Sequence, residues 1–494
     1  MPAMFDFPFI PSSDREADAL CIEDKFYHYD FLNNRFSCIA QEIKKRNLRG
    51  QAIGLVASDH YDTYAAILAI WATGNTYVPI NPYLPSDRID SIISQAGIKL
   101  LMYSIDEVKP SVMPSEVLKL STMNTVCESV QAVSPKDDEI AYILFTSGST
   151  GTPKGVPVSY GNVRSFLRNL PEMDYDLSSH DRFLQMFDLS FDLSIVSILT
   201  PFLFKGCLFT VPNNNIKYTE IYRLLEEYEI NFAILVPSVV AYLKPYFEDI
   251  DLPHMRYMCL SGEAVPYDLT VEWKKCCPNA VFQNLYGPSE ATIYCVTYTM
   301  PRENIPSANG IVCIGRATKE IDCVIINENN KEVKQGEKGE LILHGKQVIQ
   351  GYLNNPEKDK EAFLEFNGKR YYRSGDICYQ DENGLYFYLG RKDYQVKIQG
   401  FRIELSEVEH HISTSLNKRR VVALADLDKT GNARIIGVIE GDLEDKNALI
   451  ADLKKKMPFY MIPAEFRTMS AFPLNNNGKI DRKTITKIQL ENAE

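Results

Sequence analysis

Residues 146–155 have the composition of a phosphate-binding loop. After a short apolar run they read Thr-Ser-Gly-Ser-Thr-Gly-Thr-Pro-Lys-Gly. Glycines let backbone N–H groups approach phosphate oxygens, hydroxyls add donors, and a lysine adds a point charge. It is not a Walker loop, because no lysine directly follows the second glycine of that frame. The alternative is a flexible surface turn, but the complete string favours phosphate contacts from Thr146, Ser147, Gly148, Ser149, Thr150, Gly151 and Lys154.

The elements expected to position this loop belong to an α/β protein. Four apolar runs, at residues 140–145, 232–236, 256–260 and 280–285, each end in a turn containing Gly, Ser or Pro. Helical patterns alternate with such runs, as in α/β proteins. Ligands of open α/β sheets bind outside the carboxyl ends of the strands. We therefore expect the four turns to meet at one crevice.

The C-terminal segment has a different pattern. Helices are expected over residues 406–415 and 447–457, and strands over 420–427 and 433–440. These elements are enough for a small α+β domain. Residues 390–393 are expected to join it to the rest of the chain.

Composition excludes several classes of function. The chain has 494 residues, of which 45% are hydrophobic and 24% are charged, the balance of a globular protein. The net charge of −12 argues against a nucleic-acid surface. The longest apolar stretches are too short to cross a bilayer, and no export signal is recognised, so no membrane role and a cytoplasmic location are expected. The eleven cysteines form no C-x-x-C pair and are expected to be reduced and structural.

Residues 146–155 resemble the signature of the adenylate-forming superfamily, which includes acyl-CoA synthetases, nonribosomal peptide synthetase adenylation domains and firefly luciferase. Five further segments, 72–82, 284–292, 372–376, 389–404 and 477–483, resemble other motifs of this family and follow its order. The resemblance spans nearly the whole chain. It implies a large N-terminal domain of stacked α/β subdomains, residues 1–392, and a small mobile α+β C-terminal domain, residues 393–494. It also implies a ligase that uses ATP and Mg²⁺ to make an acyl-adenylate and then passes the acyl group to a thiol.

The family motifs assign roles to individual residues. Lys479 is the expected catalytic lysine, which bridges the α-phosphate and the substrate carboxylate, and Glu290 is the expected Mg²⁺ ligand. Asp393 is the expected hinge, about which Lys479 leaves the crevice while Gly400 and a strand over residues 395–403 line the thiol path. The adenine and ribose contacts implied by the motifs are Gly262, Glu263, Asn284, Tyr286, Asp376 and Arg391.

The string Phe191-Asp192-Leu193-Ser194 resembles the amino-acid branch of the family, in which this Asp binds the α-ammonium of the substrate. A buried cation needs a paired anion, so the residue type at this position is informative. The alternative is that Asp192 caps a helix. By positional match, the other acyl-pocket residues are Leu193, Val196, Cys259, Ser261, Leu285, Ile293 and Tyr294.

Substrate and acceptor remain open at this point. The chain resembles stand-alone amino-acid adenylation enzymes and D-alanine–carrier-protein ligases, but those ligases carry Cys at position 261 and smaller residues at 285 and 294. An aminobenzoate is an alternative acid. The expected partner is a carrier protein whose phosphopantetheine arm is supplied in trans, as in nonribosomal peptide-type biosynthesis, with coenzyme A as the runner-up. A non-catalytic adenylate sensor and a luciferase-like enzyme are the alternatives from other functional classes.

Overall fold

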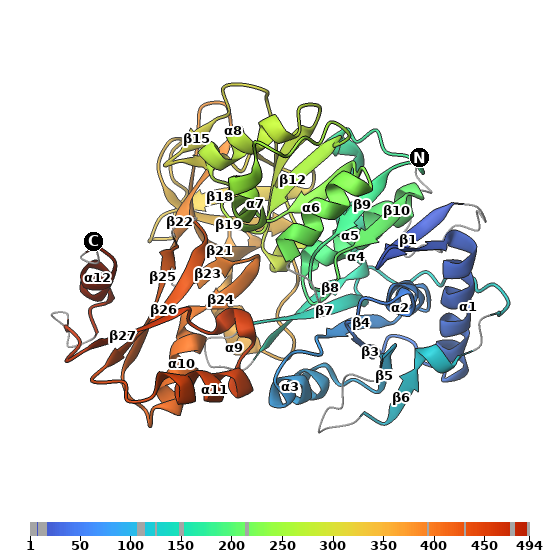
Figure 1. Cartoon of the computed structure of the whole chain (residues 1–494), viewed down its shortest axis with the longest axis horizontal. Coiled ribbons are helices and arrows are strands. Elements are labelled where there is room, and N and C mark those ends of the chain that lie inside the picture. Colours follow the sequence, from blue (N-terminus) through green and yellow to red (C-terminus); the bar gives the residue numbers. More distant parts are fainter. Residues whose placement is uncertain are drawn as a thin grey trace.

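The computed structural model describes residue 7 and residues 17–105, 114–123, 126–147, 153–212, 217–392, 395–428, 431–474 and 480–491. A large N-terminal part contains three main sheets, and a smaller C-terminal part, orange to red in Figure 1, lies against one side of it. This organisation confirms the predicted α/β fold class.

The largest sheet contains nine strands. Their spatial order is β17 (Arg316–Ala317), β14 (Val296–Met300), β13 (Val281–Tyr286), β12 (Tyr257–Ser261), β11 (Phe232–Leu235), β9 (Arg182–Gln185), β10 (Cys207–Thr210), β1 (Asp18–Ile22) and β2 (Lys25–His28). From β13 to β1 neighbouring strands are parallel, and the strands at both edges are antiparallel. The parallel register brings the carboxyl ends of β11, β12 and β13 to one edge, as the sequence predicted.

A second sheet contains six strands. Their order is β6 (Glu116–Lys119), β5 (Leu100–Tyr103), β3 (Ala52–Val56), β4 (Thr76–Ile80), β7 (Ile140–Thr146) and β8 (Lys154–Ser159). All neighbours are parallel except β7 and β8, whose antiparallel register sets Thr146 opposite Lys154. The two ends of the predicted phosphate loop therefore lie side by side.

Helices fill the space between and around these sheets. The helices are α1 (Tyr29–Lys45), α2 (Tyr61–Ala72), α3 (Ser86–Ala96), α4 (Tyr160–Asn169), α5 (Asp192–Phe204), α6 (Lys217–Glu227), α7 (Pro237–Leu243), α8 (Tyr267–Cys276) and α9 (Pro356–Ala362). Both α2, which packs on β3 and β4, and α5, which packs on β9 and β10, are buried almost all round and share one hydrophobic cluster. Apolar residues on every face are what such a position requires. No helix within the described ranges is long and apolar enough to cross a bilayer.

A third, antiparallel sheet completes the N-terminal part. Its order is β18 (Ile321–Ile326), β19 (Gly339–Gly345), β21 (Lys369–Gln380) and β20 (Phe363–Phe366), and β22 (Tyr386–Arg391) also pairs with β21. The register of β21 and β22 sets Asp376 directly opposite Arg391. A short pair, β15 (Ser307–Ala308) and β16 (Ile311–Val312), lies outside this sheet.

The C-terminal part has hydrophobic clusters of its own, all from residues after 395. Its elements are α10 (Leu405–Ser415), β25 (Val421–Leu427), β26 (Ala433–Glu440), α11 (Lys446–Lys456), β27 (Glu465–Met469) and α12 (Arg482–Thr486). The bounds of α10, α11, β25 and β26 agree with the sequence prediction to within one residue at each end. The single strand expected over residues 395–403 is wrong. It is a hairpin of β23 (Gln395–Ile398) and β24 (Phe401–Glu404), because Gln399 and Gly400 turn the chain with φ of 52° and 82°.

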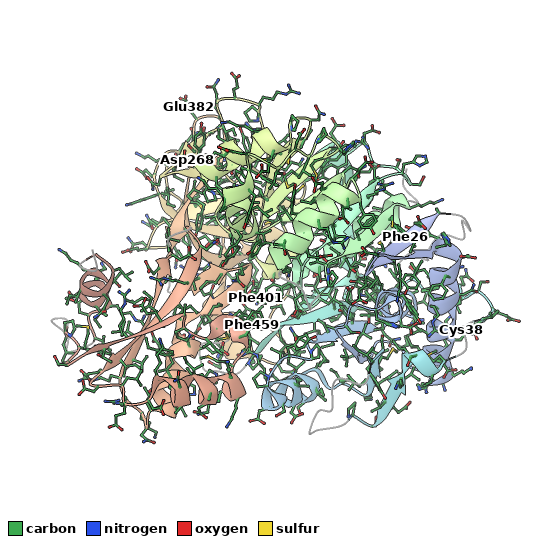
Figure 2. All side chains as sticks on the ribbon, in the orientation of Figure 1. Phe26, Cys38, Asp268, Glu382, Phe401 and Phe459 are labelled. Carbon is green, nitrogen blue, oxygen red and sulfur yellow. A yellow bond between two sulfur atoms is a disulfide. The ribbon has the colours of Figure 1, made fainter. Side chains whose placement is uncertain are left out.

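One cysteine pair corrects another expectation. Cys38 of α1 and Cys127 form a disulfide, so the prediction that every cysteine is reduced is wrong for these two; Cys38 is labelled in Figure 2. They are far apart in sequence but meet because residues 128–131 run beside α1. Gln41 and Lys44 of this helix donate hydrogen bonds to the carbonyls of Glu128 (2.8 Å) and Gln131 (3.1 Å). No C-x-x-C spacing marks such a long-range pair.

Candidate active site

A cavity lies where the large part meets the β23–β24 hairpin. Its wall includes the ends of β7 (Thr146, Ser147), β12 (Ser261) and the turn after β13 (Gly287). The hairpin closes the cavity with residues that include Gly400. Three of the four predicted strand ends therefore reach one cavity. The fourth turn, after β11, contributes Ser238 to an adjoining cavity.

Two residues expected at the ribose and adenine, Arg391 and Tyr286, contact a third, Asp376. Arg391 Nη1 lies 2.8 Å from Asp376 Oδ1 and also donates to the Ser374 carbonyl at 3.0 Å. The Tyr286 hydroxyl donates to the other Asp376 oxygen. Burial, with Asp376 next, raises the pKa of the Tyr286 phenol well above its usual value. Asp376 and Arg391 line the cavity. An arginine and a phenol orient the Asp376 carboxylate there.

The other residues expected near adenine are placed differently. Gly262 lines the cavity with φ of 83° and its Cβ position would lie 3.8 Å from Gly400 Cα, so the two glycines allow a close approach. Glu263 accepts hydrogen bonds from the backbone N–H groups of Ser238 and Gly400, both at 2.9 Å. Asn284 is buried and its amide donates to the Cys313 carbonyl at 3.0 Å, which is a contact within the fold.

The described ends of the phosphate loop are polar and buried. Thr146 Oγ1 is buried without a hydrogen-bond partner among the residues that the structure describes. Ser147 Oγ donates to the Arg402 carbonyl at 2.8 Å. Lys154 Nζ lies 3.5 Å from Glu404 Oε1 and 5.4 Å from the centre of the Tyr352 ring. Burial, with Arg402 next, lowers the pKa of Lys154 to about 8. Gly148, Ser149, Thr150 and Gly151 lie outside the described residues.

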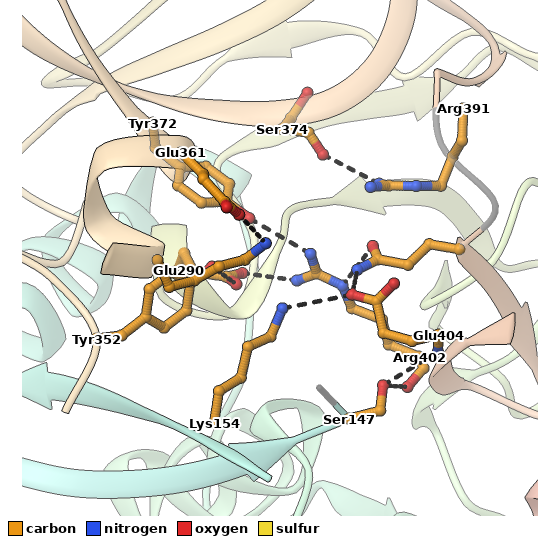
Figure 3. Close-up of polar contacts among 12 residues, drawn as sticks. Ser147, Lys154, Glu290, Tyr352, Glu361, Tyr372, Ser374, Arg391, Arg402 and Glu404 are labelled. Atoms are coloured by element: carbon orange, nitrogen blue, oxygen red, sulfur yellow. Dashed lines mark hydrogen bonds and ion pairs between the residues drawn. The ribbon is translucent and has the colours of Figure 1, made fainter. Parts of the chain in front are cut away.

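Glu290, the expected metal ligand, is completely buried and holds two partners (Figure 3). It lies in the short turn Ser289–Ala291 that follows β13. One carboxylate oxygen accepts from the Tyr352 hydroxyl at 2.6 Å, and the other lies 2.8 Å from Arg402 Nη1. Burial alone would raise the pKa of this carboxyl, but Arg402, Lys154 and Tyr352 together lower it to about 2. Glu290 is therefore a fixed negative charge.

Asp192 is the first residue of α5 and lines the cavity. The N-cap of this helix is Phe191, so the alternative that Asp192 is the N-cap residue is wrong. Burial raises the pKa of Asp192 above its usual value, while Ser289 and Lys397 act in the opposite direction. Lys397, on the hairpin, also lines the cavity.

The expected acyl-pocket residues fall into two groups. Asp192, Leu193, Ser261 and Ile293 line the cavity, and the Ser261 hydroxyl donates to the Leu285 carbonyl at 2.7 Å. The other four pack behind the cavity wall and are exposed by 2% or less: Val196, Cys259, Leu285 and Tyr294. The Tyr294 ring packs edge-on against Phe166, with centroids 4.8 Å apart. Half of the expected acyl-pocket residues therefore reach the cavity wall and half do not.

Lys479 and Asp393 lie outside the described residues, so their predicted roles are not placed. Ile480, which follows Lys479, packs in the hydrophobic cluster between β25, β26 and α12. In Figure 1 α12 lies at the outer edge of the C-terminal part, whereas the β23–β24 hairpin lies against the large part. Asp393 lies in the gap between Lys392 and Gln395. The Lys392 N–H donates to the Gly375 carbonyl at 2.8 Å, and the hairpin begins at Gln395.

Comparison with known proteins identifies the family. The profile described as "AMP-binding enzyme" matches residues 12–353. The chain belongs to the AMP-binding enzyme family. A D-alanine–D-alanyl carrier protein ligase of Bacillus licheniformis is 32% identical over 486 residues, which cover 94% of this chain and 94% of the relative. This confirms that the chain is an adenylate-forming ligase.

Two further members of the family extend the comparison. A linear gramicidin synthase of Brevibacillus parabrevis is 30% identical over 489 residues, which cover 97% of this chain but 9% of that protein, so the chain spans a small fraction of its length. The Vibrio cholerae adenylation domain AlmE, solved in complex with glycyl-adenosine-5'-phosphate, is 25% identical with a TM-score of 0.85. That alignment covers 98% of this chain and 96% of AlmE.

The residues of this AMP-binding enzyme fit a magnesium ion, which the family implies. Mg²⁺ is usually held by one or two carboxylates together with substrate phosphates and water. Glu290 supplies one buried carboxylate, and the Arg402 guanidinium lies beside it as a positive charge. Arg402 and the Thr146 hydroxyl, which has no hydrogen-bond partner among the described residues, both line the cavity. In the part of the chain that the structure describes, no cluster of three or more His, Cys, Asp or Glu forms a complete metal site.

Sequence reasoning missed the hairpin side chains and Tyr352. Residues 389–404 were recognised as a motif, but Lys397, Arg402 and Glu404 received no role although all are charged and enter the site. The signal that could have identified them is their charge, because they lie in a segment expected to line the crevice. Tyr352 had no comparable signal, because a tyrosine after glycine is common in turns. Its contact with Glu290 depends on tertiary packing alone.

Proposed function

We propose that this enzyme activates a small amino acid with ATP and transfers the aminoacyl group to the phosphopantetheine thiol of a carrier protein. The observation that carries the proposal is the position of Asp192, a carboxylate in the wall of the same cavity that Asp376, Arg391 and Thr146 line. A carboxylate at this place can pair with an α-ammonium while the substrate carboxylate faces the nucleotide. Relatives that ligate D-alanine to a carrier protein support both the acid class and the acceptor.

The proposed roles follow from the charges. Asp376, which accepts hydrogen bonds and cannot donate them when ionised, suits the two ribose hydroxyls, and Arg391 and Tyr286 orient it. Lys154 and the loop hydroxyls suit the triphosphate. Glu290 and Thr146 would hold Mg²⁺, which supplies charge neutralisation between phosphate oxygens. Because two anions must be brought together and negative charge grows in the transition state, the chain contributes positioning and cationic stabilisation.

The cavity favours a small acid. Tyr294 and Leu285 are buried outside the cavity wall, next to Ile293 and Ser261, which line it. Both are larger than the residues of D-alanine–carrier-protein ligases at these positions, and a larger wall leaves less room for the substrate. These two large side chains support glycine, alanine or an acid of similar size and disfavour an aminobenzoate.

Enlarging this wall tests the size assignment. In Tyr294→Ala, exchange of pyrophosphate into ATP with a bulky apolar amino acid should rise relative to exchange with glycine or alanine by about tenfold or more. The reason is that loss of the phenol opens space beside Asp192. Tyr371→Ala is the matched control, because Tyr371 is equally buried but belongs to the third sheet, where it donates to Asp322. An unchanged preference in the Tyr294 variant would place the acyl group elsewhere.

A route for the thiol is supported by a second cavity. It has a volume of about 710 Å³ and adjoins the first, with which it shares Phe187, Gln399 and Phe401. Two of its wall residues, Tyr83 of the large part and Phe459 of the small part, are largely exposed, so it opens between the two parts. Figure 2 labels Phe401 and Phe459 in this central region. A thin, extended phosphopantetheine arm suits such a passage.

The adenylation step requires an arrangement of the chain other than this one. With the hairpin in the cavity, Ile480 packs in a hydrophobic cluster of the C-terminal part, and its neighbour Lys479 would act in a different arrangement. The proposed hinge is Asp393, between Lys392, which is bonded to the large part, and Gln395 of the hairpin. The boundary between residues 392 and 393 and the mobility of the C-terminal domain belong to this proposal.

A further inference from the structure

Strand β24 places one cation and one anion in the phosphate site of the large part (Figure 3). Arg402 Nη1 lies 2.8 Å from Glu290 Oε2, and Glu404 Oε1 lies 3.5 Å from Lys154 Nζ. Both partners in the large part are buried, Glu290 completely and Lys154 to all but 6%. A buried charge must be paired, so each of these two groups needs a counter-charge when nothing else occupies the site.

The backbone of the same strand also contacts Ser147, at the start of the phosphate loop. Ser147 Oγ donates to the Arg402 carbonyl at 2.8 Å and accepts from the Glu404 N–H at 3.2 Å. A phosphate oxygen would accept a hydrogen bond from the same hydroxyl. Three groups of the large part, the Glu290 carboxylate, the Lys154 ammonium and the Ser147 hydroxyl, therefore each contact one or both of two residues of β24. Glu290 has Tyr352 as a further partner, and Glu290 and Lys154 also attract each other.

The charges supplied by β24 are of the kinds that magnesium pyrophosphate carries. A divalent cation would bind the Glu290 carboxylate, and phosphate oxygens would bind Lys154 and Ser147. Arg402 supplies a positive charge where the metal would lie, and Glu404 supplies a negative charge where a phosphate would lie. The same atoms cannot hold both sets of partners.

We propose that β24 is an internal substitute for magnesium pyrophosphate, so that docking of the hairpin and binding of magnesium pyrophosphate exclude each other. Arg402 and Glu404 are the positioning residues of this exchange. The inference rests on the proposed function for its order of events, in which pyrophosphate leaves before the hairpin enters. Once docked, the hairpin also keeps pyrophosphate from returning to attack the adenylate.

Hydrogen exchange of backbone amides tests this exclusion without any acyl substrate. In the docked hairpin the Gly400 N–H donates to Glu263 and the Glu404 N–H donates to Ser147, so both amides are protected. Magnesium and pyrophosphate together, at ten times their dissociation constant measured by calorimetry, should speed exchange in residues 395–404 about tenfold, by competitive linkage. Exchange in β25 and β26 should not change and serves as the internal control.

Each outcome of this experiment has a distinct meaning. If magnesium pyrophosphate binds and exchange in residues 395–404 stays slow, the exclusion is wrong while the proposed adenylation remains. If no binding is detected, both proposals are contradicted. Faster exchange together with inactivity toward all amino acids would support the exclusion and contradict the proposed function.

Two arginine variants separate this role from general packing. Arg402→Gln removes the cation from Glu290, so residues 395–404 should exchange about tenfold faster without ligand, with little further change on adding magnesium pyrophosphate. Arg420→Gln is the matched control, since it removes a half-exposed arginine that precedes β25 and pairs with Glu440, the last residue of β26. Protection equal to wild type in Arg402→Gln would overturn the role of Arg402. Slow exchange in β25 and β26 shows that the variant is folded.

Discussion

Replacing Lys479 with alanine is expected to reduce ATP–pyrophosphate exchange by about 10²- to 10³-fold, the usual cost of removing one group that stabilises transition-state charge. Its cation is needed only while charge grows on the α-phosphate, when the two anions react. Transfer from a chemically synthesised aminoacyl-adenylate to a carrier protein should therefore persist, because the hairpin lines the cavity in this arrangement of the chain.

The neighbouring lysine provides a matched control for this experiment. Lys483 lies in α12 and is exposed, and Lys483→Ala should leave both exchange and transfer at the wild-type level. Normal exchange in Lys479→Ala would remove the catalytic assignment. Equal loss of exchange and transfer would instead indicate a structural role for Lys479.

Replacing Asp192 with asparagine is expected to lower kcat/KM for an amino acid by about 10²- to 10⁴-fold, since loss of one partner of a buried charge pair costs about 3–5 kcal/mol. The KM for ATP should change little, because Asp376, Arg391 and Lys154 are untouched. The measurement is exchange at varied amino acid and at varied ATP.

Asp268 offers a control for effects of a helix terminus. It also lies in the first turn of a helix, α8, but is exposed at the surface of the large part, where Figure 2 labels it. Asp268→Asn should therefore have no effect on exchange. If Asp192→Asn affects the amino acid and its deaminated analogue equally, the ammonium role is wrong.

The sequence predicted four strands of the large part, β7, β11, β12 and β13, because local patterns determine them. The run before Thr146 was identified as a strand, and β7 ends at that residue. The motif around Asp376 and Arg391 was predicted to bind one group, and the β21–β22 register sets these two residues opposite each other.

The sequence could not predict contacts that depend on how distant parts meet. Arg402 and Glu404 lie far along the chain from Glu290 and Lys154, and only docking of the hairpin pairs them. The disulfide between Cys38 and Cys127 depends likewise on the path of a loop beside α1. Which of the expected pocket residues reach the cavity depends on side-chain packing, such as that of Tyr294 against Phe166, which residue identity alone does not reveal.

The central claim is that this ligase activates a small amino acid, and ATP–pyrophosphate exchange with paired acids tests it most directly. The pairs are glycine with acetate and alanine with propionate, with aminobenzoates as larger amino-bearing acids and no added acid as the blank. The account predicts exchange with glycine or with one enantiomer of alanine, and little with acetate, propionate or aminobenzoates, because Asp192 pairs with an α-ammonium and Tyr294 limits size. Exchange as strong with a deaminated or aromatic acid as with any amino acid would contradict it.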